Sequence, residues 1–324
     1  MNYEELKETV TAFQKSRIIL TACQLDIFTS IGETGQSAEA ISNALNLNKK
    51  AAEKLLNALV AINLLTKSKD IYSNTHSSLI YLSKDSPEYM EGIMHTGHLW
   101  DTWSDLTEVV KTGKNKRIPE INERGEAWLE AFINSMHYRG IVQAFAQISG
   151  IDLSNVESIL DVGGGSGCFS MAFLERKPTL KTTVFDLPNV IPISQKIIEK
   201  EGFKGKIDHY SGDYTVDELP TGFDLIFLSA IIHINSFAIN QQLVNKCYHS
   251  LNTNGKIVIQ DWIMNDAKTE PASGALFSIN MLVTVDEGDC YSESEIQTWL
   301  SHAGFSSVRR VDLGKGLGQV IATK

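Results

Sequence analysis

The sequence lacks long apolar runs and an excess of positive charge, and each absence excludes a class of protein. No apolar stretch approaches the roughly 18 residues that a membrane span needs. The opening MNYEELKETV is polar and acidic, unlike a secretory signal peptide. The net charge of −10 argues against non-specific binding to nucleic acid. We therefore expect no membrane partner and no nucleic-acid partner.

Cysteine is also scarce, and the few cysteines stand far apart. Cys23, Cys168, Cys247 and Cys290 form no CxxC pair. Such spacing predicts neither a disulfide framework nor a zinc site, so no metal is expected. Free cysteines are typical of a reducing compartment, and the expected location is the cytoplasm.

The 324 residues are enough for one large or two ordinary domains. Three regions differ in pattern. Residues 1–85 predict a small winged-helix-like domain, 86–150 a helical region that lines a substrate pocket, and 151–324 a domain of alternating strands and helices.

The N-terminal region predicts helices followed by a β-wing. Residues 3–30 read as one helix, whose apolar face is wide enough to indicate burial, for instance in a subunit interface. Ser37 can cap a second helix, a turn at 46–48 leads to a third, and 64–72 form the wing. A winged helix can bind DNA. Because three lysines make only a weak basic surface, we favour a role in dimerisation and in covering a substrate.

The region 86–150 is rich in aromatic residues and histidine around a polar loop, KTGKNKRIPEINERGEA. A mixture of His, Trp and Met suits an apolar pocket with a few polar anchors. Stripes of such residues at helical spacing are also common in cores. The candidates for the pocket, with one from a later helix, are His98, Trp100, Met136, His137 and Met281.

The stretch SILDVGGGSGCFS, residues 158–170, predicts a buried strand, a tight glycine turn and the start of a helix. Glycines permit positive φ and leave no Cβ to block a ligand pressed against the main chain. The helix start offers free N–H groups to a nucleotide-like ligand. Because an acid, Asp161, precedes the first glycine, the turn suits a cationic ligand better than a pyrophosphate.

From residue 157 onward strands and helices alternate, which predicts an α/β fold with a doubly wound, largely parallel sheet. Ligands of such sheets bind at the carboxyl ends of the strands. Five polar residues fall at or just beyond predicted strand ends: Asp161, Asp186, Asp213, His233 and Asp261. This gathering is the strongest indication of a site in the chain.

The strand-end acids each have a ligand-binding and a structural interpretation. Asp186 lies about 20 residues after the turn, where a carboxylate accepts both ribose hydroxyls of an adenosine; alternatively it caps the next helix. Asp213 and Tyr214 can contact an adenine, or Asp213 can be a turn residue after Gly212. Asp161 can hold the amino group of an amino-acid-bearing ligand.

At this point the chain resembles the plant-type (caffeate/flavonoid-like) and bacterial small-molecule O-methyltransferases that use S-adenosylmethionine. The resemblance covers nearly the whole chain. It rests on a winged helix ending in YSNT and on LDVGGGSG, VFDLPNVI, SGDY, FDLIFLSAIIH, NGKIVIQDW and YSESEIQTWLSHAGF. It implies a homodimer with intertwined N-terminal domains and a Rossmann-like methyltransferase domain whose mostly parallel seven-stranded sheet has an antiparallel seventh strand.

The resemblance also implies roles for single residues. His233 matches the general base that deprotonates a phenolic or enolic hydroxyl of a small-molecule acceptor, and Asp261 matches the acid that orients it. The residues expected to bind S-adenosylmethionine are Asp161, Gly163, Gly164, Gly165, Asp186, Leu187, Gly212, Asp213, Tyr214 and Ser229.

The chain departs from the family pattern at three places. Ile234-Asn235 replace the Asp-Trp that follows the histidine, Ser229 replaces a lysine, and Cys290 stands where a second supporting Glu is expected. Asp289 or Glu287 is a candidate substitute for that Glu. These departures leave open N- or C-methylation, non-methyl chemistry such as hydroxylation or decarboxylation, and a winged-helix regulator that senses S-adenosylmethionine.

Overall fold

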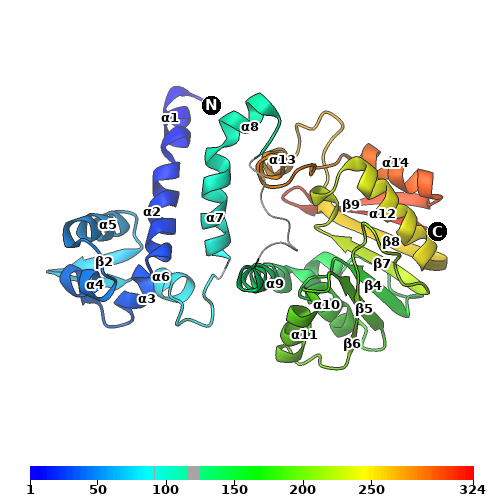
Figure 1. The fold of residues 1–324 in the computed structure, drawn as a ribbon, viewed down its shortest axis with the longest axis horizontal. Helices are drawn as coiled ribbons and strands as arrows, with labels where there is room; N and C mark the ends of the chain where they lie inside the picture. The colour runs from blue at the N-terminus through cyan, green and yellow to red at the C-terminus, as the bar shows by residue number, and fades with distance from the viewer. Residues whose placement is uncertain (91, 116–124) are drawn as a thin grey trace. The chain divides into compact units, whose positions relative to one another are not determined.

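The computed structural model describes residues 1–90, 92–115 and 125–324, and the chain divides into two compact units, Met1–Trp100 and Asp101–Lys324 (Figure 1). The central part of the polar loop predicted after residue 110 lies outside the described residues.

The first unit begins with three helices rather than the single helix predicted over 3–30: α1 (Tyr3–Thr11), α2 (Phe13–Gln24) and α3 (Ile27–Ile31). Asp26, with φ of 60°, adopts a left-handed conformation that ends the helical path before α3. The predicted burial applies to α2 and α3. All residues of α1 are described by the structure, and none of their side chains is buried.

A helix pair and an antiparallel hairpin form the rest of the first core. The elements are β1 (Gln36–Ser37), α4 (Ala38–Ala44), α5 (Lys49–Ala61), β2 (Leu65–Ser68), β3 (Ile71–Asn74) and α6 (His76–Leu82). Ser37 Oγ accepts a hydrogen bond from the Ala40 N–H at 3.1 Å, which confirms the predicted cap. The strand order is β1-β3-β2. Helices and hairpin follow one another in the predicted order. α7 (Ile93–Ser104) then crosses the boundary between the units.

The second unit is built on a seven-stranded sheet with the order β6-β5-β4-β7-β8-β10-β9. The strands are β4 (Ser158–Val162), β5 (Lys181–Asp186), β6 (Ile207–Ser211), β7 (Phe223–Ser229), β8 (Leu251–Trp262), β9 (Ser306–Gly314) and β10 (Leu317–Thr323). The pairs from β6 to β8 are parallel. Of the described strands in this sheet, β10 alone runs antiparallel to both neighbours. The largely parallel sheet with an antiparallel seventh strand is confirmed.

Helices pack on both faces of this sheet (Figure 1). α9 (Glu126–Ile148), α10 (Cys168–Arg176) and α11 (Ile191–Lys200) belong to one core, and α12 (Phe237–Ser250) and α14 (Glu293–Ala303) to the other. Ser292 caps α14 as predicted, with a capping box formed by Glu295. The unit also contains α8 (Leu106–Thr112), η2 (Ile232–Ile234) and α13 (Ala272–Thr284). Within the described residues, no helix is long and apolar enough to cross a membrane.

Candidate active site

The glycine turn joins β4 to α10 at the carboxyl edge of the sheet. Gly163, Gly165 and Gly167 have φ of 66°, 54° and 75°, in the left-handed region that favours glycine. A Cβ on Gly163 would collide with the Ile231 side chain, whereas one on Gly165 would meet only Ile133, at 4.0 Å, among the described atoms. The turn thus leaves room beside Gly165 for a ligand to approach the main chain.

Asp161 is buried next to this turn, with 1% of its surface exposed. Its Oδ2 accepts a hydrogen bond from Ser170 Oγ at 2.9 Å. Burial raises the pKa of Asp161 to about 7, partly opposed by the Ser170 hydroxyl. A cationic ligand group beside this carboxyl would favour its charged form.

Asp186 ends β5 and ties its strand to the glycine turn. Its Oδ2 accepts from the Gly165 N–H and its Oδ1 from the Leu187 N–H, each at 2.7 Å. Burial raises the pKa of Asp186 to about 6, against the effect of these two bonds. A carboxylate has about four acceptor positions, so ribose hydroxyls can still be accepted beside the backbone contacts.

Asp213 and Tyr214 follow β6 and have different partners. Asp213 Oδ1 accepts from the Thr215 N–H at 2.9 Å and from Thr215 Oγ1 at 2.7 Å, the turn arrangement of the two expected. The Tyr214 hydroxyl donates to Asn235 Oδ1 at 3.0 Å. Gly212 packs against Phe185, since a Cβ there would lie 2.8 Å from that ring.

His233 and Asp261 form a buried pair. His233 lies in η2, just after β7, and Asp261 lies in β8. Nδ1 of the imidazole is 2.9 Å from both carboxylate oxygens, and the exposed fractions are 8% for His233 and 1% for Asp261. A carboxylate accepting from Nδ1–H selects the neutral tautomer that has its lone pair on Nε2. The pair therefore has the geometry of a general base with an orienting acid.

Two aromatic residues that were not predicted from the sequence as site residues contact this histidine. Phe277 of α13 contacts the imidazole edge-on, with ring centroids 4.9 Å apart, and Trp262 does so at 5.8 Å. The two rings stack on each other at 3.9 Å. The position of Trp262 directly after Asp261 was the available signal. For Phe277 the sequence offered none.

Cys290 and Ser229, two of the positions that depart from the expected pattern, have different surroundings. Cys290 is 1% exposed, and burial, with Asp261 and Asp289 nearby, raises the pKa of its thiol to about 12. Asp289, a candidate for the missing acid, pairs with Lys268 at 3.1 Å and accepts from Ser278 at 2.6 Å.

Ser229 is the last residue of β7, and its hydroxyl is hydrogen-bonded to a side-chain amide. Its hydroxyl accepts from Gln260 Nε2 at 3.0 Å, and the same amide donates to Gln147 at 2.9 Å. Gln260 in turn accepts from Gln319 at 2.8 Å. Ser229 thus joins a set of side-chain amides that links the sheet to α9.

The pocket candidates lie on three helices, α7, α9 and α13. His137 is buried on α9, where Nδ1 lies 3.2 Å from Ser166 Oγ of the glycine turn and Nε2 3.6 Å from Glu201. Met136 is half-buried on the same helix, and Met281 is buried on α13. His98 and Trp100 belong to the first unit, where the Arg17 guanidinium lies over the Trp100 ring at 5.3 Å.

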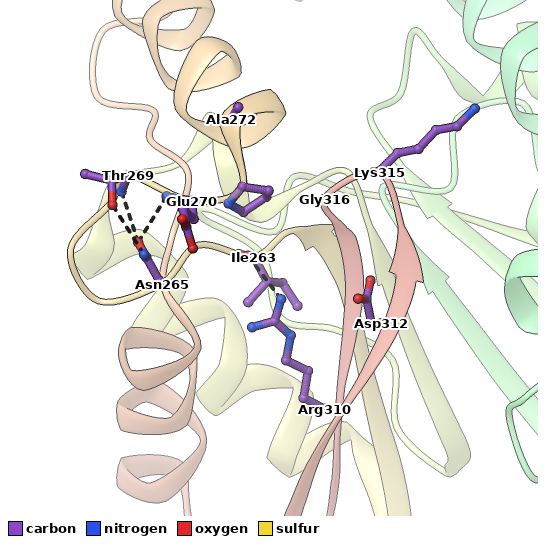
Figure 2. Close-up of a pocket in the computed structure, with 10 residues that line it drawn as sticks. Ile263, Asn265, Thr269, Glu270, Ala272, Arg310, Asp312, Lys315 and Gly316 are labelled. Carbon is purple, nitrogen blue, oxygen red and sulfur yellow. Dashed lines mark hydrogen bonds between the residues drawn. The ribbon is translucent and has the colours of Figure 1, made fainter.

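A separate open cavity of about 640 Å³ lies at the β9–β10 turn and the start of α13 (Figure 2). Arg310 and Lys315 contribute its basic groups, and Glu270 and Asp312 its acidic groups. The Arg310 guanidinium donates to the Ile263 carbonyl at 3.3 Å. None of the predicted site residues is among the described residues that line it.

The fold and the site together define a class. A Rossmann-like sheet carries a glycine turn, a buried carboxyl (Asp161) and a half-buried one (Asp186) that a cationic ribose-bearing ligand would complement, and an imidazole–carboxylate pair at the same edge. These residues fit S-adenosylmethionine, a nucleoside with an amino acid and a sulfonium. The class is that of Rossmann-like methyltransferases.

Comparison with known proteins gives the family. A family model for the O-methyltransferase domain matches residues 103–306, and one for the O-methyltransferase dimerisation domain matches residues 7–84. The chain belongs to the O-methyltransferase family and is an S-adenosylmethionine-dependent O-methyltransferase of small molecules, with a dimerisation domain.

Individual relatives are similar over nearly the whole chain. The 3-hydroxy-5-methyl-1-naphthoate 3-O-methyltransferase of Streptomyces sahachiroi is 31% identical, over 94% of this chain and 90% of that protein. The acetylserotonin O-methyltransferase of Bos taurus is 28% identical, over 99% and 98%. The crystal structure of human N-acetylserotonin methyltransferase in complex with S-adenosylmethionine superposes with a TM-score of 0.86 at 25% identity, covering 99% of this chain and 97% of that one.

Proposed function

We propose that the chain methylates a phenolic or enolic hydroxyl and that His233 is its general base. The observation that supports this most strongly is the buried hydrogen bond between His233 Nδ1 and Asp261. It leaves Nε2 as the nitrogen that accepts the proton of the acceptor hydroxyl. A phenol has a pKa of about 10 and a histidine one of about 6.5, so proton transfer is favourable only as the oxygen loses charge to the new bond.

The reaction is a direct displacement. S-adenosylmethionine supplies a methyl group that its sulfonium already activates. The acceptor oxygen forms the new O–CH₃ bond, the S–CH₃ bond breaks, S-adenosylhomocysteine leaves, and the hydroxyl proton passes to His233 Nε2. The protein contributes orientation and proton removal, and positioning of this kind can supply much of the rate enhancement.

We infer a planar aromatic acceptor. Trp262 and Phe277 present stacked rings beside the imidazole, and aromatic rings prefer to pack on other planar rings. The naphthoate and acetylserotonin enzymes among the relatives carry aromatic acceptors in their names. Met136 and Met281 are proposed as adaptable apolar pocket residues.

We propose that the cofactor contacts are those expected from the sequence: Asp161, Gly163, Gly164, Gly165, Asp186, Leu187, Gly212, Asp213, Tyr214 and Ser229. The raised pKa values of Asp161 and Asp186 support two of them, since these carboxyls have no buried cationic partner in the described structure. We also propose a homodimer formed through a winged-helix-like first unit, and a cytoplasmic location, in keeping with four free cysteines.

The test is turnover of a panel of aromatic hydroxyl compounds, followed by release of S-adenosylhomocysteine. His233→Ala should lower kcat by 10²–10⁴-fold, the range typical of a positioned base. His249→Ala, which removes an exposed histidine from α12, is the matched control and should leave kcat unchanged. Full turnover by His233→Ala on an accepted substrate would refute the general-base role.

A further inference from the structure

The segment that carries His233 contains a buried polar residue. Asn235, two residues after the histidine, is 6% exposed. A buried amide requires hydrogen-bond partners, because a buried polar group left without one destabilises the fold. The partners of Asn235 therefore show what this buried amide connects.

Those partners form a continuous chain of side chains. The Tyr214 hydroxyl donates to Asn235 Oδ1 at 3.0 Å, and Asn235 Nδ2 donates to Asn240 Oδ1 at 3.0 Å. Asn240 is fully buried on α12, and its Nδ2 donates to the Ile232 carbonyl at 2.8 Å. We name Tyr214, Asn235 and Asn240 the polar relay. It begins beside Gly212 and Asp213 and ends on the peptide immediately before His233.

The main chain is also held on the other side of the histidine. The Tyr291 hydroxyl donates to the Asn235 carbonyl at 2.6 Å. Two carbonyls that flank His233, those of Ile232 and Asn235, are thus fixed by side chains from α12 and from the loop before α14. Because the histidine lies in a single short turn, η2, these two anchors hold its main chain, while Asp261 of β8 holds its ring.

The hydrogen bonds of the polar relay all run in one direction, from Tyr214 through Asn235 to Asn240. Tyr214 must donate, since Asn235 Nδ2 is already directed at Asn240 and only Oδ1 faces the phenol. Burial is the main cause that raises the pKa of Tyr214, so its hydroxyl remains protonated and remains a donor throughout the working pH range. Removing the hydroxyl breaks the first bond of the chain without introducing charge.

We propose that Tyr214, Asn235 and Asn240 are positioning residues for methyl transfer: they connect the cofactor edge at Gly212–Asp213 to the main chain that places His233. The inference rests on the proposed role of His233 as general base. It assigns to this chain a polar support for the main chain of the base. Cofactor bound against Tyr214 and acceptor bound against His233 then contact two ends of one hydrogen-bonded system.

The principal test is Tyr214→Phe, which keeps the ring and removes the hydroxyl. We expect kcat to fall about tenfold, the equivalent of one lost hydrogen bond, while KM for the acceptor changes less than twofold. Tyr210→Phe on β6, an exposed tyrosine that stacks on Phe185, is the matched control and should retain kcat. Melting temperatures of both variants establish that they are folded.

A second readout distinguishes positioning from packing. The His233 imidazole signal in an NMR spectrum of the full chain, assigned by its loss in His233→Ala, should shift in Tyr214→Phe and remain in place in Tyr210→Phe. Asn235→Asp keeps an acceptor for Tyr214 but loses the donor to Asn240, so it should also shift the signal and lower kcat.

The outcomes separate the two proposals. An unmoved His233 signal with kcat within twofold of the parent protein overturns the relay, as does an effect confined to KM for S-adenosylmethionine. Retained activity in His233→Ala would instead overturn the general-base role, whatever Tyr214→Phe does.

Discussion

The carboxyl of Asp161 has one hydroxyl partner, Ser170, and almost no contact with water. Its raised pKa means that the folded protein without ligand binds a proton that the unfolded chain has already released. A buried acid of this kind destabilises the empty fold at neutral pH. The same property makes the carboxyl available to a cationic group, as expected of a binding residue rather than a structural one.

Asp161→Asn tests this balance. The unfolded pKa is about 3.9 and the folded value about 7, so the contribution of Asp161 to stability is full below pH 4 and is lost as pH rises to 7. We expect the ligand-free variant to be more stable than the parent at pH 8 by on the order of 1–3 kcal/mol. At pH 4 the difference should vanish.

Denaturant unfolding at the two pH values measures that change, and calorimetry measures cofactor binding. If Asp161 holds the amino group, the stabilised variant should bind S-adenosylmethionine at least tenfold more weakly at pH 8. If the variant and the parent protein were equally stable at pH 8 as well as at pH 4, the raised pKa of Asp161 would be contradicted.

Asp261→Asn addresses the tautomer of His233. An amide at this position can donate to Nδ1 and thereby place the imidazole proton on Nε2, which then cannot accept a proton. We expect kcat to fall by about 10²–10⁴-fold with KM for the acceptor nearly unchanged. Steady-state kinetics provides the measurement, and a change in KM alone would show that Asp261 shapes the pocket instead.

At the residue scale, the sequence predicts the site residues at or just after strand ends and misses those that reach the site from α13 and from the segment before α14. Asp161 and Asp186 lie at the ends of recognisable strands and His233 follows one, so their position at one edge could be foreseen from parallel topology. Phe277 lies on α13 and Tyr291 lies just before α14, and only the folded chain brings these residues to the segment of His233.

At the scale of elements, the segment between α13 and α14 packs against the main chain of His233. Gly288 packs so closely on the His233 carbonyl that a Cβ there would collide with it and with Val285. Lys268 anchors this segment by pairing with Asp289 at 3.1 Å and Glu295 at 2.6 Å. A side chain at Gly288 must therefore displace either η2 or its own segment, and the ion pairs of Lys268 oppose the second movement.

Gly288→Ala should lower kcat more than tenfold and cost about 1–3 kcal/mol in stability, the usual effect of overpacking. Gly150→Ala is the control, because a Cβ there would meet no described atom within 4 Å. Chemical denaturation and turnover of the two variants provide the comparison. Parent-like kcat in Gly288→Ala would show that the segment yields without moving the histidine.

Element boundaries were predicted well where caps mark them and poorly where they do not. Ser37 and Ser292 identify the starts of α4 and α14 by side-chain chemistry. The breaks between α1, α2 and α3 have no glycine or proline. Asp26 takes its left-handed conformation with Thr29 donating to its carboxylate at 2.8 Å, a contact that sequence periodicity does not reveal.

At the scale of the whole molecule, α1 and the start of α2 expose apolar side chains that a second protein chain could cover. Tyr3, Leu6, Val10 and Phe13 are 52–75% exposed, and their spacing of three or four places them on one stripe. Val10 and Phe13 fall within the region matched by the dimerisation domain. A continuous apolar stripe on an exposed helix is typical of a protein interface, which supports the proposed homodimer.

The double substitution Val10→Lys with Phe13→Lys places two charges on this stripe. If the stripe is buried in the dimer, the dissociation constant should rise by at least about a hundredfold, because each buried charge costs more than 1.4 kcal/mol. Val216→Lys is the matched control, since Val216 is 76% exposed in the second unit, far along the chain from the matched dimerisation region. Sedimentation across a range of concentrations measures both constants. An unchanged constant in the double variant would place the dimer interface on another surface, and turnover measured at the same concentrations would show whether methyl transfer requires the dimer.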